Sequence, residues 1–227
     1  MARKIYLSPS SQPENIYAYG NTNEQEQCRR IADVCEAALT RCGFEVANAG
    51  YGTMYERVAE SNAWNADLHV PIHTNSYNGT VSGTRVFCFN ESGEGYKAAK
   101  CVFDTLAPIT PGTSENLSVN RNLYEVSYAN APTVYVEAEF HDVAACAKWI
   151  IENVGAIGEA IAEGICNYYG VSYVTPFAEK YSVVIGECGT QFEAEAKLDK
   201  IKALINTAES ALVTLNAIVQ DAKIIKH

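Results

Sequence analysis

"FEVANAGYGTMYERVAESNAWNADLHVPIHTN", residues 44–75, contains a complete strand–helix–strand unit. "FEVANAG" at 44–50 indicates a strand, "TMYERVAESNAW" at 53–64 has helical periodicity, and "DLHVPIH" at 67–73 is typical of a buried strand. Two parallel strands need a long crossover between them, and a helix usually supplies it. The stretch therefore predicts a parallel α/β sheet.

The same alternation of strand and helix extends to both sides of this unit. Strands are expected at 4–8, 84–90 and 131–140, and helices at about 24–42, 95–106 and 142–168. Residues 107–122 are rich in Pro, Ser and Asn, so a long loop without regular structure is expected there. The pattern predicts an α/β fold, a three-layer sandwich with a mainly parallel twisted sheet flanked by helices.

We expect one large domain over residues 1–170, a linker over 171–180 and a small α+β appendage over 181–227. The appendage is too short to bury a secure core alone, so it must dock on the larger domain or on a second copy of itself. Helices expected near 193–205 and 208–219 each carry an apolar stripe. These stripes predict a homodimer formed through the C-terminal segment.

Composition excludes several classes of partner. A net charge of -10 gives no basic face for a phosphate backbone, so nucleic acid is not an expected ligand. No apolar run reaches the ~20 residues of a membrane span, and the N-terminus shows no signal-peptide pattern. We expect a chain made in the cytoplasm, with no integral membrane segment. Its eight cysteines form no CxxC pair and are interpreted as reduced structural thiols.

His73 ends the strand at 67–73, where open α/β sheets collect catalytic groups, and polar Thr74 and Asn75 follow it. His69 lies on the same strand face, but at ~3.3 Å per residue the two rings cannot meet on one metal. We interpret His69 as a hydrogen-bonded core residue and His73 as a site residue.

Two glutamates, Glu137 and Glu139, interrupt the apolar strand "YVEAEFHD". Glutamate is rarely buried without a partner, so one of the two is expected to line a site. Histidine and glutamate ligands with a further glutamate as base are typical of a hydrolytic zinc site. The sequence contains no HExxH motif, which would indicate such a metal site directly. The serines at 8, 10 and 11 are not part of a GxSxG motif, which would indicate a serine nucleophile.

Residues 3–170 resemble the zinc-dependent N-acetylmuramoyl-L-alanine amidases of bacterial autolysins and phage endolysins. The resemblance is carried by an ordered series of motifs: "YLSPS", "EQEQCRRIA", "YERVAESNAWNADLHVPIHTN", "SGTRVFCF", "RNLYEV", "APTVYVEAEFHD" and "IGEAIAEGI". It implies one Zn²⁺, a peptidoglycan substrate, and cleavage of the amide between N-acetylmuramic acid and L-Ala of the stem peptide.

The resemblance assigns Glu24 and His73 as metal ligands and Glu137 as the catalytic glutamate, which moves the proton of the attacking water. The family's first histidine ligand is missing, because Ser11 or Gln12 occupies its loop position. His141, four residues after Glu137, is the candidate third ligand. Gln12 and water are the alternatives, and His141 is equally compatible with capping the next helix or bonding Asp142.

Two other functions remain open from the sequence: a metal-free peptidoglycan-binding pseudoenzyme, and a zinc peptidase that cuts the stem peptide. The segment "YSVVIGECGTQFEAEAKLDKIKALI" weakly resembles half of a SPOR module, which binds bare glycan strands. Packing or dimerisation explains this segment equally well. An amidase of either origin, phage or bacterial, is expected to act on the cell wall after release.

Overall fold

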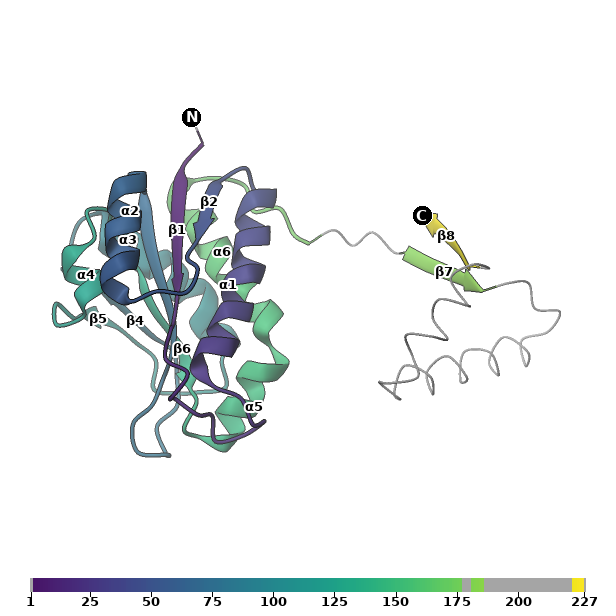
Figure 1. Cartoon of the computed structure of the whole chain (residues 1–227), viewed down its shortest axis with the longest axis horizontal. Helices are drawn as coiled ribbons and strands as arrows, with labels where there is room; N and C mark the ends of the chain where they lie inside the picture. The colour runs from purple at the N-terminus through teal and green to yellow at the C-terminus, as the bar shows by residue number, and fades with distance from the viewer. Residues whose placement is uncertain (1, 177–180, 186–221, 227) are drawn as a thin grey trace. The chain divides into compact units, whose positions relative to one another are not determined.

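A computed structural model describes residues 2–176, 181–185 and 222–226 of the chain (Figure 1). The chain divides into two compact units, Met1–Thr175 and Pro176–His227. In the second unit the described elements are two antiparallel strands, β7 (Tyr181–Ile185) and β8 (Ala222–Lys226). The helices expected at 193–205 and 208–219 lie outside the described residues.

The first unit alternates strands and helices along the chain. Its strands are β1 (Lys4–Pro9), β2 (Glu45–Asn48), β3 (Leu68–Asn75), β4 (Arg85–Cys88), β5 (Asn116–Val119) and β6 (Tyr135–Phe140). Its helices are α1 (Glu24–Arg41), α2 (Met54–Trp64), α3 (Glu94–Leu106), α4 (Tyr124–Tyr128), α5 (Ala144–Glu152) and α6 (Val154–Tyr169), with a short 3₁₀ turn, η1 (Ala107–Ile109), after α3.

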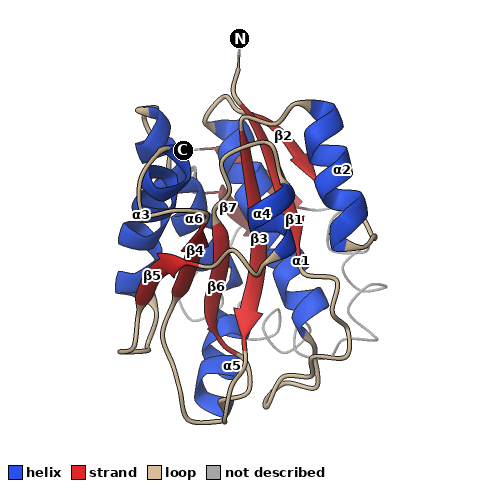
Figure 2. Ribbon diagram, turned by 90° about the vertical axis from the view of Figure 1, so that its left-hand side faces the viewer, coloured by secondary structure: helices blue, strands red, loops and turns tan. Residues whose placement is uncertain are grey.

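The six strands form one sheet in the order β2-β1-β3-β6-β4-β5 (Figure 2). β1, β2, β3 and β6 are mutually parallel, whereas β4 pairs with β6 in the antiparallel direction and β5 runs parallel to β4. The predicted fold class, a mainly parallel sheet flanked by helices, is confirmed.

The expectation of an irregular loop over 107–122 was wrong in one part. Residues Asn116–Val119 form β5, the edge strand beside β4. Four residues, "NLSV", are too few to show strand periodicity, and their strand conformation depends on the backbone hydrogen bonds that β4 offers. A local pattern could not reveal that partner.

The two faces of the sheet differ in chemistry. One face is apolar and belongs to the main core, where it meets α1, α3 and α6; it consists of Ile5, Leu7, Leu68, Val70, Ile72, Val134, Val136 and Ala138. Because side chains alternate along a strand, the intervening residues point to the other face, toward α2 and α4. That face carries Tyr6, Ser8, His69, His73, Tyr135 and Glu137. The polar strand residues of the sequence therefore meet on one side.

Helix α1 is positioned by its N-terminal cap and by a tight contact with α6. The Asn23 side chain accepts a hydrogen bond from the Glu26 backbone N–H, which fixes Glu24 as the first helical residue. Cys28 and Cys35 are buried free thiols on its inner face, in agreement with their interpretation as structural residues.

None of the helices described in this unit is long and apolar enough to cross a membrane.

Candidate active site

The candidate site lies where β3 and β6 end and α1 begins. His73 and Glu137 are paired positions of the two parallel strands, so both side chains leave the same face of the sheet. The pairing shifts register immediately afterwards, between His73 and Asn75, which marks the end of regular pairing at the site. His73 lies in "VPIHTN" and Glu137 in "VYVEAE", so the topology brings together two residues that are 64 positions apart in the sequence.

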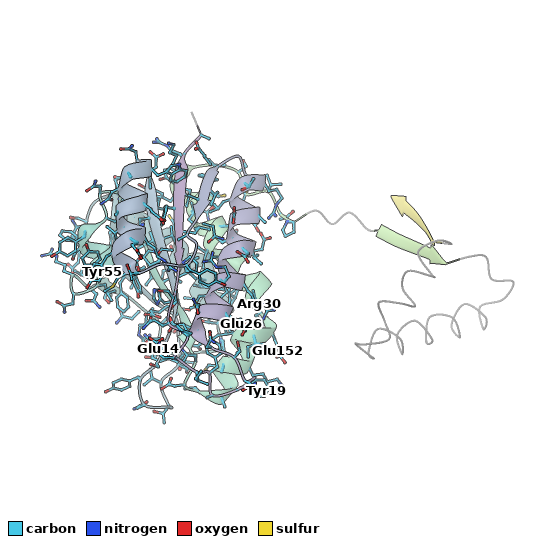
Figure 3. All side chains as sticks on the ribbon, in the orientation of Figure 1. Glu14, Tyr19, Glu26, Arg30, Tyr55 and Glu152 are labelled. Carbon is cyan, nitrogen blue, oxygen red and sulfur yellow. The ribbon has the colours of Figure 1, made fainter. Side chains whose placement is uncertain are left out.

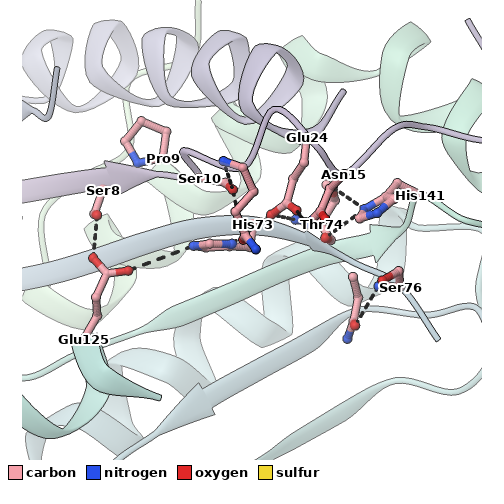
Figure 4. A network of polar contacts seen from close by, with 12 residues as sticks. Ser8, Pro9, Ser10, Asn15, Glu24, His73, Thr74, Ser76, Glu125 and His141 are labelled. Atoms are coloured by element: carbon pink, nitrogen blue, oxygen red, sulfur yellow. Dashed lines mark hydrogen bonds and ion pairs between the residues drawn. The ribbon is translucent and has the colours of Figure 1, made fainter. Parts of the chain in front are cut away.

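Glu24 contacts His73 directly. Its Oε1 lies 2.8 Å from His73 Nδ1, while Asn15 donates to its other oxygen at 2.5 Å (Figure 4). Burial would raise the pKa of Glu24, but the hydrogen bond and charge of His73 outweigh it and the pKa lies below its usual value. For His73, burial is opposed by Glu24 and by the charges of Glu137 and Glu125, so the His73 pKa is raised. The two predicted ligands therefore form a close pair.

Glu137 is an isolated carboxylate beside this pair. Its Oε2 is shielded from solvent and has no hydrogen-bond partner among the described residues. Burial raises the pKa of Glu137 to about 8, a rise that His73 opposes and Glu24 reinforces. A buried oxygen without a donor is costly, and this one lies beside Glu24 and His73, where it could meet a cation or a reacting water.

Glu139 has a different environment from Glu137. Its Oε2 accepts hydrogen bonds from the backbone N–H groups of Gly83 and, at 3.1 Å, Phe140. These contacts tie the end of β6 to the loop before β4. Its Oε1 is buried without a hydrogen-bond partner among the described residues, as Glu137 Oε2 is, so the two glutamates differ in the backbone donors that hold Glu139 and in the nearness of Glu137 to His73.

Glu125, in the short helix α4, is a site residue that the sequence analysis missed. Its Oε1 accepts from Ser8 at 2.5 Å and lies 3.2 Å from His69 Nε2, while its Oε2 lies 4.0 Å from His73 Nε2 (Figure 4). A single glutamate among the apolar residues of "NLYEVSY" was its only local signal. His69 is fully buried and hydrogen-bonded, as expected of a core histidine, but its partner is a residue of the site.

His141 lies beside Thr74, the residue after His73. Its Nδ1 is 3.0 Å from Thr74 Oγ1 and 2.9 Å from the Thr74 carbonyl oxygen, and its ring stacks on Tyr17 at 5.1 Å. Burial lowers the pKa of His141, and the charge of Glu24 opposes that effect. The chain does turn back at the end of β6, but the described contacts of His141 join it to Thr74 and Tyr17, not to His73.

A cavity of about 450 Å³ opens onto His73 and Glu125. Ser11 and Gln12, one of which the resemblance predicts at the position of the family's first histidine, line the same cavity. Its other lining residues are Glu14, Thr53, Met54, Tyr55, Arg57, Leu123, Tyr124 and Tyr135; Figure 3 labels Glu14 and Tyr55. A pocket of this size is within the range of small-molecule binding sites.

The side chains at the site are of the types that bind zinc, but only two of them, Glu24 and His73, are placed as ligands. Carboxylate oxygen and imidazole nitrogen are both zinc ligands, and Glu24, His73 and the unpartnered Glu137 Oε2 cluster together. Within the described part of the chain, however, no three His, Cys, Asp or Glu side chains are arranged to hold a metal ion. The residues present thus fit a cation at Glu24 and His73, with the third ligand open.

Comparison with known proteins gives a family match and the same fold. The profile of the N-acetylmuramoyl-L-alanine amidase family matches residues 11–167. The catalytic domain of CwlV, an amidase from Bacillus (Paenibacillus) polymyxa var. colistinus, superimposes with a TM-score of 0.68 at 17% identity, covering 75% of this chain and 99% of that one. An amidase from Clostridium difficile 630 gives 0.68 at 20% identity, covering 74% and 97%.

A curated relative, the uncharacterized protein YqiI of Bacillus subtilis (strain 168), is 30% identical over 121 residues. The match spans 52% of this chain and 58% of that protein. Because the family profile covers well over half of the chain, the protein belongs to the N-acetylmuramoyl-L-alanine amidase family, a family of peptidoglycan hydrolases.

Proposed function

We propose that this protein is a peptidoglycan hydrolase that cleaves the amide bond between N-acetylmuramic acid and the L-alanine of the stem peptide. The observation that carries the proposal is the cluster of Glu24, His73 and Glu137 at the ends of β3 and β6, since Glu24 contacts His73 and Glu137 keeps a buried unpartnered oxygen. Membership of the N-acetylmuramoyl-L-alanine amidase family supports the choice of this amide as the bond that is cleaved. The cavity beside His73 is the place for the substrate.

The proposal includes one zinc ion held by Glu24 and His73. Zinc, when bound, supplies Lewis-acid chemistry: it polarises a carbonyl oxygen and makes water more acidic. His141 is the proposed third ligand, and Gln12 or water are its competitors. Gln12 lines the cavity with His73, whereas His141 must exchange its contact with Thr74 to take part.

Glu137 is the proposed proton carrier. It takes a proton from the water that attacks the scissile carbonyl carbon and passes that proton to the leaving nitrogen. The C–N bond breaks, the lactyl group becomes a carboxylate and the L-alanine amine is released. A pKa raised to about 8 in the zinc-free site makes Glu137 a group that holds a proton readily, and a nearby cation would lower that pKa toward neutrality.

Metal content tests this proposal against the metal-free alternative. We expect the full chain, purified and dialysed, to retain zinc at near one equivalent, and His73→Ala to lose it. A metal-free parent protein that still binds peptidoglycan would instead support the pseudoenzyme, a wall-binding protein that has lost its metal.

The C-terminal segment is proposed to form a homodimer. Its expected apolar stripe, which includes Leu198, Ile201 and Leu204, is too large for a monomer to leave in water. Light scattering of the full chain beside a chain ending at residue 175 tests this: a dimer and a monomer, respectively, are expected. Two equal monomeric masses would contradict the dimer. A glycan-binding role, from the half-SPOR resemblance, is the competing proposal.

A further inference from the structure

Each ring nitrogen of His73 faces a different carboxylate. Glu24 Oε1 lies 2.8 Å from Nδ1, and Glu125 Oε2 lies 4.0 Å from Nε2. A neutral imidazole binds a metal through one nitrogen and donates a proton from the other, and the partner of that donor fixes which nitrogen is which. The two carboxylates therefore cannot share one role at His73.

Glu125 is held so that one oxygen remains for His73. Ser8 and His69 both engage Oε1, at 2.5 and 3.2 Å, which leaves Oε2 directed toward the His73 ring. His69 is fixed in turn, because its Nδ1 lies 3.0 Å from Ser61 Oγ and its ring stacks on Tyr6 at 5.4 Å. The Glu125 carboxylate of α4 is thus held by residues of β1 and β3, and α2 holds His69 in place.

Burying Glu125 and His69 together costs folding free energy, which a role at the site would explain. Glu125 is 4% exposed and His69 is 0% exposed, in a layer where apolar side chains would pack without any polar partner. The remaining oxygen of this buried carboxylate faces Nε2 of His73, whose N–H can donate to it.

We infer that Glu125, oriented by His69 and Ser8, is a positioning residue that accepts the Nε2 proton of His73. The Nδ1 atom, beside Glu24, is then left as the metal-binding nitrogen. The inference rests on the proposed zinc site. The two atoms must approach by about 1 Å to reach the 2.7–3.2 Å range of a hydrogen bond, a distance within the reach of a side-chain rotation.

Zinc affinity tests the inference, with Glu125→Gln as the variant and Glu139→Gln as its matched control. Glu139 is equally buried but bonds to backbone N–H groups of Gly83 and Phe140. Competition with a chromophoric chelator should show zinc binding about 10- to 100-fold weaker for Glu125→Gln, as for other partners of metal-binding histidines. Glu139→Gln should bind zinc as the parent does.

A second measurement needs no variant. Ring ¹⁵N NMR of the zinc-loaded parent should show His73 protonated at Nε2 and metal-bound at Nδ1. Metal binding through Nε2, or equal zinc affinities for Glu125→Gln and the parent, would overturn the inference while leaving the proposed function intact. A parent that binds no zinc would overturn the metal site of the proposed function and this inference with it.

Discussion

His73 and Glu137 occupy paired positions on the parallel strands β3 and β6, one residue from each strand at the same end of the sheet. Parallel pairing places both side chains on one face of the sheet. The proposed ligand His73 and the proposed proton carrier Glu137 are therefore positioned by the strands and not by a loop. A site built on paired strands is rigid, and its two members can be tested separately.

Glu137→Ala should retain zinc and reduce turnover by ~10² or more, because a general base that is not principally a ligand is removed. Lysis of purified cell walls measures the turnover, and metal analysis of the same preparation measures the zinc. Glu139→Ala is the control, since Glu139 lies two residues further along the same strand but accepts hydrogen bonds from the backbone N–H groups of Gly83 and Phe140. If Glu139→Ala abolishes turnover while Glu137→Ala spares it, the catalytic carboxylate has been misassigned.

The third ligand is identified by comparing three variants. Zinc affinity should fall strongly in His73→Ala, because a residue that binds the metal directly is lost, and we expect the zinc affinity of His141→Ala to fall as well. Gln12→Ala should stay near the parent. A His141→Ala protein that binds zinc as tightly as the parent would confine His141 to its contacts with Thr74 and Tyr17.

Stability of the zinc-free protein should decline as the pH rises from about 5 to 8. Burial raises the pKa of Glu137 to about 8, so between the unfolded and folded pKa values the folded state holds a proton that the unfolded state has released. The stabilising contribution is therefore fully present below the unfolded pKa and is lost through the folded one.

Chemical denaturation at pH 5, 6.5 and 8 measures this dependence, with Glu137→Gln as the comparison. Glutamine cannot titrate, so the variant should gain stability relative to the parent as the pH rises. A difference between the two proteins that stays constant across this range would show that Glu137 does not titrate there. The zinc-loaded parent should show a shallower dependence, because a nearby cation favours the ionised carboxylate.

The contact between α1 and α6 predicts opposite effects for two glycines of one helix. A Cβ at Gly158 would lie 2.7 Å from both the Ile31 carbonyl oxygen and Val34 Cβ, whereas a Cβ at Gly155 would meet nothing within 4 Å. Gly158→Ala should destabilise the fold by about 1–3 kcal/mol through overpacking. Gly155→Ala should stabilise it by roughly 0.5–1 kcal/mol, since alanine is the better helix former. Equal urea midpoints for the two variants would contradict this packing.

The strand and helix pattern predicted most of this fold because each element has its own periodicity. Strand β3 and helix α1 are examples: an apolar run predicted the strand, and helical periodicity predicted the helix. Strand β5 was missed because four residues carry no period, and its conformation comes from β4.

The site was only partly accessible to sequence reasoning. Glu24, His73 and Glu137 could be selected from motif order, but Glu125 could not, because its role depends on the position of α4 over β3. His69 was interpreted correctly as buried and hydrogen-bonded, yet the identity of its partner, which connects it to the site, is a property of the tertiary structure.

The central claim is the bond that the protein cuts, and mass analysis of its peptidoglycan products tests it most directly. Purified cell walls treated with the zinc-loaded full chain should release stem peptides with a free L-alanine N-terminus and leave glycan strands that carry intact lactyl carboxylates. Fragments cut within the stem peptide would identify a zinc peptidase instead, and would contradict the amidase assignment.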